Sequence, residues 1–348
     1  MTESYLTDYY YTMFPTVCQL DTRYLASKEG LKFWSRTVTL FALPIQILTA
    51  FCIIKRTPKS MNFVKSSLLK VNSWCIFSGL VLSFVVTPFN FFPYFAGFTF
   101  GLAADVGCSI VVQFYLGLAM SFGILISVTI LFENRSSLIT MNRLAIKKRC
   151  TRILWIVTNF LGSVVLVSPV FFHLPDQLEA KKEILKILPC PSKEFFTEPF
   201  LVLASTPFWK TYLTIALMFI YLCLMLQILF FSACCIYYLF IFKNAQVSPQ
   251  TRRLQVQSFY GIVGQTLIPI VFDSIPMLVF LNRQNRDDYD QYNNNLMGLT
   301  IILHNGAASL SILLVHSPYR RFLKNVILGV FGKKVEENKV AGNGSRQF

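Results

Sequence analysis

The apolar residues of this sequence fall in seven long runs separated by short polar segments. The 27 residues from Val106 to Phe132 contain no Asp, Glu, Lys, Arg or His. As a helix they would extend about 40 Å, more than the roughly 30 Å hydrocarbon core of a bilayer, so we expect a tilted membrane-spanning helix. The other apolar runs predict six further spans, at about 37–54, 68–90, 153–173, 211–242, 257–281 and 296–315.

Composition supports a polytopic membrane protein. The 348 residues are 54% hydrophobic and 14% charged, with a mean hydropathy of +0.53, which is too apolar for an ordinary soluble domain. The net charge of +15 comes from short basic clusters between the apolar runs, so we interpret it as a topological bias and expect no nucleic-acid partner. The predicted fold is an all-α membrane protein, a seven-transmembrane helix bundle.

The positions of Lys and Arg predict the orientation of this bundle. With the amino terminus outside, 21 of the 32 basic residues lie in inner segments and 11 in outer segments, as the positive-inside rule requires. Residues 1–32 lack the pattern of a cleaved signal peptide, so the first span is expected to act as its own insertion signal. We expect an extracellular amino terminus at 1–36, a seven-helix transmembrane domain at 37–315, and a cytoplasmic segment at 316–348.

The segment after the seventh span has an apolar periodicity of its own. Phe322, Val326 and Val330 recur every four residues, with basic residues on their flanks. This pattern predicts a short amphipathic helix that lies on the inner leaflet and is attracted by anionic lipid. The alternative is a disordered basic tail.

Aromatic residues gather between the second and third spans. Residues 89–100 contain six Phe and one Tyr. Such a cluster is typical of an aromatic belt at the membrane interface, and the alternative interpretation is a lid over a ligand entrance.

Three cysteines fall where an oxidising compartment could reach them: Cys18, Cys108 and Cys190. Cys108 begins the third span, and Cys190 lies in the longest outer loop. A disulfide between these two would tether the loop over the mouth of the bundle. We therefore predict this pairing. The alternatives are that both are free, or that Cys18 is a competing partner.

Charged residues at the inner end of the third span are candidates for a conformational switch. Glu133, Asn134 and Arg135 stand where that helix leaves the membrane. Polar neighbours can hold such a charge in the resting state and release it when the inner helix ends separate. Arg252 and Arg253 belong to the next basic inner loop, and Pro269 and Pro276 are expected to kink the sixth span and act as hinges.

Four polar residues at membrane depth are candidates for a ligand pocket: Gln113, Asp273, His304 and Asn305. Asp273 is about 12 Å from the outer end of its span, where an ionised carboxylate needs a partner or a wet cavity. The alternative for all four is a structural hydrogen bond to a neighbouring helix.

Catalytic motifs are absent from the sequence. It has no HExxH, no GxSxG and no glycine-rich phosphate loop, and its three histidines share no metal-ligand spacing, so we expect neither an enzyme nor a cofactor or metal. A transporter or ligand-gated channel is the main alternative function. Such a protein would be expected to show internal repeats and a chain of intramembrane charges, and neither is seen.

Three short motifs resemble those of nematode seven-transmembrane chemoreceptors, specifically serpentine receptor class H of the Str superfamily. They are Phe-Glu-Asn-Arg at 132–135, Gln-Thr-Arg-Arg-Leu-Gln at 250–255 and His-Ser-Pro-Tyr-Arg at 316–320, and the similarity extends from about residue 30 to 325. The resemblance implies a chemosensory G-protein-coupled receptor in the plasma membrane of sensory neurons, in their cilia. It further implies a small odorant or pheromone-like ligand and a heterotrimeric G protein at the inner face.

Comparison with rhodopsin-like receptors suggests inner-face residues. Glu133, Asn134 and Arg135 occupy the place of Asp-Arg-Tyr, and Tyr319 and Arg320 lie near that of Asn-Pro-x-x-Tyr. The second span has no acidic residue, so the sodium site of those receptors is missing. We expect ligand to bind among the outer halves of spans three, five, six and seven.

Overall fold

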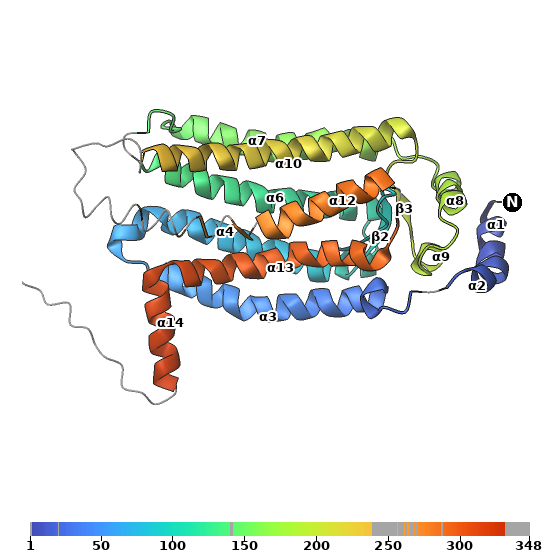
Figure 1. The fold of residues 1–348 in the computed structure, drawn as a ribbon, viewed down its shortest axis with the longest axis horizontal. Coiled ribbons are helices and arrows are strands. Elements are labelled where there is room, and N and C mark those ends of the chain that lie inside the picture. Colours follow the sequence, from blue (N-terminus) through green and yellow to red (C-terminus); the bar gives the residue numbers. More distant parts are fainter. Residues whose placement is uncertain are drawn as a thin grey trace, which may run out of the picture.

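The molecule is a bundle of long helices that lie side by side along its long axis (Figure 1). The computed structural model describes residues 2–19, 21–139, 142–238, 270–286 and 288–330, with isolated positions between 256 and 268. Within these ranges, six helical segments are long and apolar enough to cross a membrane. They are α3 (Lys28–Lys55), α4 (Asn62–Leu80) with the π-helical turn that continues it (Val81–Val85), α6 (Ile110–Ser137), α7 (Arg149–Phe172), α10 (Pro207–Ile236) and α13 (Gln291–Val315).

A further helix occupies the carboxyl-terminal part of the sixth predicted span. The π-helical turn Ile270–Ser274 leads directly into α12 (Ile275–Arg286), with Pro276 in the first turn of that helix. Hydrogen bonds join the π-helical turn to α10 and to α13. Together the helices confirm the predicted all-α membrane bundle. Pro269, Arg252 and Arg253 lie outside the described residues.

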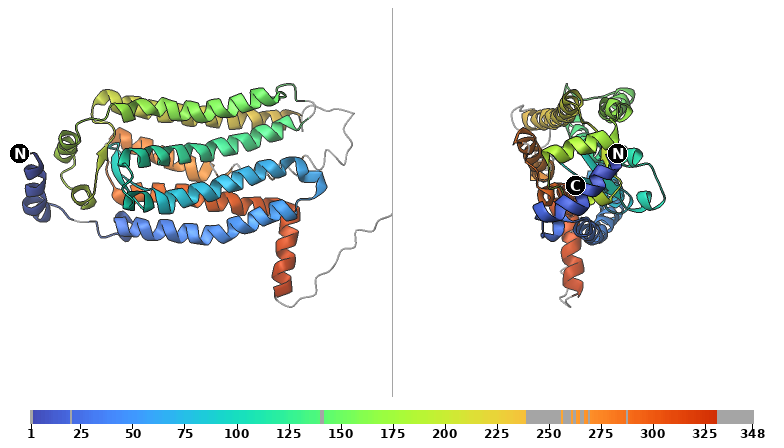
Figure 2. Two further views of the ribbon diagram at one scale, coloured as in Figure 1. Left: turned by 180° about the vertical axis from the view of Figure 1, so that it is seen from behind. Right: turned by 90° about the vertical axis from the view of Figure 1, so that its right-hand side faces the viewer.

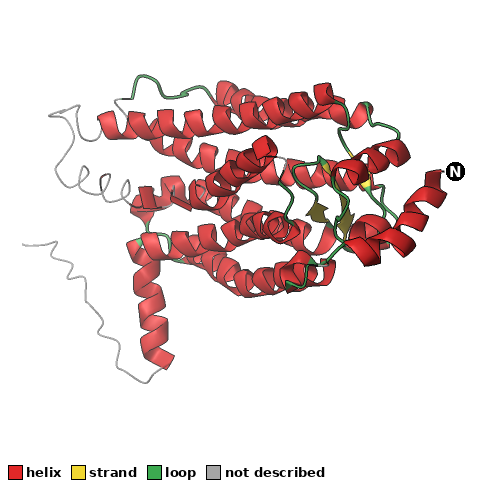
Figure 3. Cartoon of the chain, turned by 45° about the vertical axis from the view of Figure 1, so that its right-hand side comes forward, coloured by secondary structure: helices red, strands yellow, loops and turns green. Residues whose placement is uncertain are grey.

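The two ends of the bundle differ. Strands and short helices gather at the end that carries the amino terminus, and the opposite end carries α14 (Ser317–Val330), which runs across the bundle axis (Figures 2 and 3). We call them the amino-terminal end and the α14 end. The short elements at the amino-terminal end are α1 (Thr2–Asp8), the π-helical turn Tyr9–Met13, α2 (Phe14–Val17), a 3₁₀ turn at Tyr24–Ala26, β1 (Thr87–Asn90), β2 (Ala96–Phe100), α5 (Leu102–Asp105), α8 (Gln177–Ile187), α9 (Glu194–Thr197) and β3 (Leu201–Val202). A second 3₁₀ turn, Lys59–Met61, joins α3 to α4 at the α14 end (Figure 1).

Polar caps decide where several helices begin. The Ser27 side chain accepts a hydrogen bond from the Gly30 amide, and Asp290 does the same for the first turn of α13. Such caps satisfy amides that have no partner within the helix. The first span therefore starts at Lys28, earlier than the predicted position 37, because a charged residue near a helix end can extend its head group to the interface.

The aromatic stretch at 89–100 folds into the protein. β1 and β2 form an antiparallel hairpin, with β3 on its other edge. Phe89, Phe91 and Phe98 are completely buried, in a cluster that also includes residues of α8 and α9. The interpretation of these rings as a lipid-facing interfacial belt is therefore wrong.

The disulfide joins Cys18 to Cys190, with 5.3 Å between their Cα atoms. Cys108 is free and exposed, so the predicted Cys108–Cys190 pairing is wrong. Aromatic contacts explain the difference: Tyr10 and Phe14 of the amino-terminal segment pack on Phe196 of the long loop, with ring centroids 5.0 and 5.1 Å apart. These contacts bring Cys18 beside Cys190, and the long loop is tied to the amino terminus rather than to α6.

Candidate functional site

An apolar cavity of about 280 Å³ lies in the half of the bundle nearest the amino-terminal end. Most of its wall comes from α6, α10, α12 with the preceding π-helical turn, α13 and the β1–β2 hairpin, and Leu31, Leu82 and Leu203 complete the described lining. The four helices in this set belong to the four spans, three, five, six and seven, among which we expected the ligand to bind. Most lining residues are Leu, Ile, Phe or Met. The polar side chains among the described lining residues are Thr87, Asn90, Ser121, Tyr221 and Asp273.

Asp273 is the acidic group on the described part of the cavity wall, and it is paired with His304. Its Oδ1 atom lies 3.0 Å from Nδ1 of His304, a residue of α13 that is completely buried. Among the described residues, Oδ2 of Asp273 and Nε2 of His304 have no hydrogen-bond partner. Asp273 lines the cavity, so one buried carboxyl oxygen without a described partner belongs to a residue of the cavity wall.

The other two predicted pocket residues lie elsewhere. Gln113 donates a hydrogen bond to the Cys108 carbonyl at 2.8 Å, which holds the turn before α6. Asn305 accepts from the Ser78 hydroxyl at 3.0 Å and so joins α13 to α4. Neither lines the cavity, which agrees with the structural alternative for these two residues.

Tyr221 was not recognised from the sequence. Its hydroxyl donates to Ser274 in the π-helical turn and connects α10 to the segment that carries Asp273. The charge-free run at 211–242 contains three other tyrosines, and Tyr is common in apolar cores, so Tyr221 is a weak signal.

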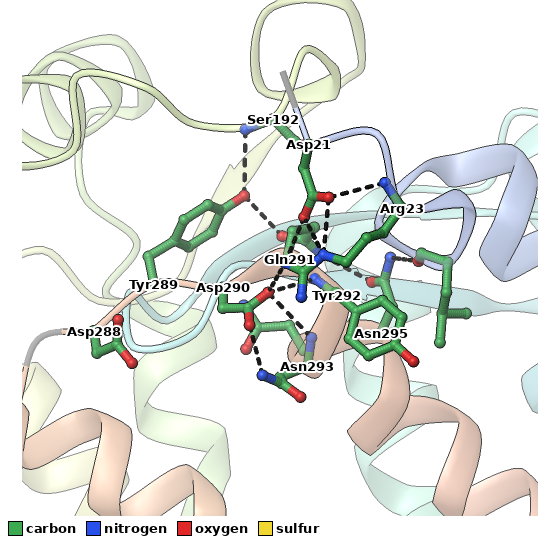
Figure 4. A network of polar contacts seen from close by, with 12 residues as sticks. Asp21, Arg23, Ser192, Asp288, Tyr289, Asp290, Gln291, Tyr292, Asn293 and Asn295 are labelled. Atoms are coloured by element: carbon green, nitrogen blue, oxygen red, sulfur yellow. Dashed lines mark hydrogen bonds and ion pairs between the residues drawn. The ribbon is translucent and has the colours of Figure 1, made fainter. Parts of the chain in front are cut away.

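A polar network fastens three segments at the amino-terminal end (Figure 4). Arg23 Nη2 lies 2.6 Å from Asp21 and 2.7 Å from Asp290, and the hydrogen bonds from Arg23 hold the pKa of Asp21 below its usual range. Tyr289 accepts from the Ser192 amide at 3.3 Å, and burial raises the pKa of this phenol. The amino-terminal segment, the long loop and the α12–α13 turn are therefore held together.

At the α14 end, an ion pair joins the Glu133 carboxylate of α6 to Arg152 of α7. Oε2 of Glu133 lies 2.7 Å from Nη2 of Arg152, and Oε1 accepts a hydrogen bond from Ser137 at 2.6 Å. The Glu133 side chain is completely buried, whereas that of Arg152 is 33% exposed. Asn134 lies at the edge of this pair, with 3.5 Å between its Oδ1 and Arg152 Nη2. Arg152 belongs to one of the basic clusters between the apolar runs, and the sequence alone did not identify it as the partner of Glu133.

Arg135 points into a second buried group at the same end. This residue is 6% exposed and lies near Tyr319 of α14 and Cys235 of α10. Tyr319 is completely buried, and its hydroxyl lies 2.7 Å from Thr57 Oγ1. The first turn of α14 is thereby fastened to the segment after α3.

His316, between α13 and α14, belongs to this second group. Burial lowers its pKa to about 3, with a further contribution from the positive charges of Arg135 and Arg320. The imidazole is therefore neutral at physiological pH. Arg320 is exposed and donates to the Leu314 carbonyl at 3.1 Å, where it caps the end of α13.

These features define a class: a multi-pass helical membrane protein with an apolar cavity in one half of its bundle and buried charged groups at the other end. A family model described as "Serpentine type 7TM GPCR chemoreceptor Srh" matches residues 26–329. The chain is also 46% identical over 330 residues to serpentine receptor class H-72 of Caenorhabditis elegans, covering 94% of each protein. The chain belongs to the Srh family of serpentine chemoreceptors, and the predicted resemblance is confirmed.

Proposed function

We propose that this protein is a chemosensory G-protein-coupled receptor that binds a small molecule in its apolar cavity and activates a heterotrimeric G protein at the α14 end. The proposal is supported by two sites at opposite ends of one helix bundle: an apolar cavity and a group of buried charged side chains. The cavity is lined by α6, α10, α12 and α13, and α6 and α10 also reach the buried charges at the other end. Membership of a receptor family does not favour the alternative of a channel or transporter.

The amino-terminal end faces the outside in this proposal. The Cys18–Cys190 disulfide supports the orientation, because disulfides persist in oxidising compartments. The excess of Lys and Arg in the segments at the other end supports it independently. We assign the receptor to the plasma membrane, in the cilia of sensory neurons, with α14 in contact with anionic lipid.

Activation in this proposal separates the helix ends near α14. The ion pair of Glu133 with Arg152 joins α6 to α7, and the buried Arg135 lies near Cys235 of α10 and Tyr319 of α14. A ligand that shifts α12 relative to α13 would favour a state in which these groups are exposed to the G protein. Among the described residues, Pro276 is the proposed hinge. Arg252 and Arg253 are further proposed contacts with the G protein.

The test is a ligand screen in cells that express the full chain, with G-protein activation as the readout. Arg135→Ala should abolish the response to a compound that activates the wild type while surface expression is retained. Arg149→Ala, which removes an exposed arginine at the start of α7, is the control and should respond normally. An undiminished response in the Arg135 variant would contradict the proposed switch.

A further inference from the structure

The chemistry of the cavity wall restricts the ligand that it can take. We infer that the ligand is a compact, uncharged, mostly hydrocarbon molecule of about nine non-hydrogen atoms that carries a hydroxyl group, and that this hydroxyl binds Asp273. The inference rests on the proposed function and names the ligand class of the same site.

The size follows from the volume of the cavity. The cavity has about 280 Å³, and a water molecule, which has one non-hydrogen atom, occupies about 30 Å³ in the liquid. Ligand sites for drug-sized molecules start at roughly 300 Å³. The cavity is therefore suited to a molecule at or below the small end of that range.

The residues that line the cavity indicate that the body of the ligand is apolar. Rings line the cavity from four separate elements or loops, including Phe95, Phe114 and Phe280, and aliphatic residues fill most of the remaining surface. Phe280 lies 4.9 Å from Phe92 between ring centroids, so the rings already form a packed aromatic surface. A hydrocarbon body would gain about 25 cal/mol for each Å² removed from water, whereas a second charge would lose its hydration without compensation.

Two polar atoms without partners in the described part of the protein indicate that the ligand carries a hydroxyl group. Oδ2 of Asp273 and Oγ1 of Thr87 both belong to residues that line the cavity, and neither has a hydrogen-bond partner among the described residues. A hydroxyl group donates to a carboxylate and accepts from a carboxylic acid, so it can satisfy Asp273 in either protonation state. A hydrocarbon would leave Oδ2 unpaired.

The number of hydrogen-bond acceptors in the wall argues against an amine. His304 already contacts Oδ1 of Asp273, and the described lining contains no second acidic group. An ammonium group has three donors and would need two acceptors besides Asp273, and the other polar side chains of the described lining are all uncharged. The Asp273–His304 pair is therefore a hydrogen-bonding point for a neutral ligand rather than the counter-ion of a cation.

The experiment measures binding to the purified full chain in lipid nanodiscs by thermal shift, without a G protein. Two matched sets of probes each keep nearly constant size: 2-phenylethanol, propylbenzene and 2-phenylethylamine, and 1-octanol, nonane and octylamine. We expect the alcohol of at least one set to bind about tenfold more tightly than its hydrocarbon and its amine, which is the effect of roughly one hydrogen bond.

Three variants distinguish binding in the cavity from partitioning of the probes into the lipid. Asp273→Leu should reduce the preference for alcohol over hydrocarbon to about one, and Asp273→Asn, which keeps a hydrogen-bonding group, should retain most of it. Gly117→Leu should weaken all probes, because a Cβ atom at this lining position would lie 4.0 Å from Val86 Cγ1 and the longer side chain would fill the cavity. Asp105→Asn, in an exposed aspartate, is the control and should bind like the wild type.

Equal binding of alcohol and hydrocarbon in both sets, tighter binding of an amine, or no binding of any probe would overturn the ligand class. An alcohol preference that survives in Asp273→Leu would overturn the assignment of Asp273. Binding of alcohols with the expected preference, but without G-protein activation by any ligand, would support the ligand class and count against the receptor function instead.

Discussion

Two buried polar groups at the α14 end illustrate how single residues contribute to this receptor. The Glu133 carboxylate is completely buried, and its charge is compensated by Arg152 and by the Ser137 hydroxyl. Removing the positive partner leaves a buried charge without compensation, whereas neutralising the carboxylate removes the charge itself. The two substitutions should therefore differ in cost.

We predict that Arg152→Ala lowers the free energy of unfolding by about 3 kcal/mol and that Glu133→Gln costs less. The measurement is the thermal midpoint of purified protein in nanodiscs. Arg149→Ala, at an exposed position of the same helix, should change the midpoint little. If Glu133→Gln were the more damaging change, the buried-charge argument would fail.

His316 predicts a pH dependence of stability. Its pKa is about 3 in the folded protein and near 6.5 when unfolded, because burial disfavours the imidazolium. The unfolded state therefore binds the proton first, and stability falls as the pH drops from about 6.5 towards 3. His316→Gln should remove roughly 2 kcal/mol of the loss expected at pH 5.

The check is the slope of the thermal midpoint between pH 7 and pH 5. The wild-type midpoint should fall more steeply than that of His316→Gln. His173→Gln, at an exposed histidine, is the matched control and should keep the wild-type slope. Identical slopes in the wild type and His316→Gln would show that His316 does not cause the loss.

The elements at the amino-terminal end depend on one another. α1 and α2 pack on the long loop through aromatic rings, and the disulfide fixes that contact across 172 residues of sequence. The Arg23 network then connects the same segment to the start of α13. The disulfide restricts the conformations of the unfolded chain, which exposed ion pairs do not do. It therefore contributes more to the free energy of unfolding than those ion pairs.

We predict that Cys18→Ser and Cys190→Ser each lower the thermal midpoint to the same extent as the double variant. The chain-entropy model gives an upper value of about 5 kcal/mol for such a long loop. Cys108→Ser should have little effect, because this thiol is free and exposed. Labelling of free thiols before and after reduction provides a second measurement. A large effect of Cys108→Ser would contradict the observed pairing.

The two ends of the molecule differ in the way that the proposed function requires. The disulfide and the cavity are at one end, and the buried Arg135 group is at the other. If the amino-terminal end faces outward, the thiols of Cys18 and Cys190 can be oxidised and the basic α14 faces anionic lipid. The opposite orientation would reverse both conditions.

We predict that an epitope tag on the amino terminus is accessible to antibody on intact cells, and that a tag on the carboxyl terminus becomes accessible only after permeabilisation. The reason is the asymmetry of Lys and Arg across the predicted membrane. A surface-exposed carboxyl-terminal tag would contradict both the orientation and the proposed site of G-protein coupling.

The sequence alone determined the membrane class, the positions of most spans and the helix after the seventh span, because long apolar runs and the periodicity of Phe322, Val326 and Val330 are local properties of the chain. Only the tertiary structure decided which cysteines pair and which polar residues line the cavity. Cys18 meets Cys190 through rings far apart in sequence, and Asp273 reaches the cavity whereas Asn305 bonds to α4. Such choices depend on how helices pack against one another, and local patterns do not contain that information.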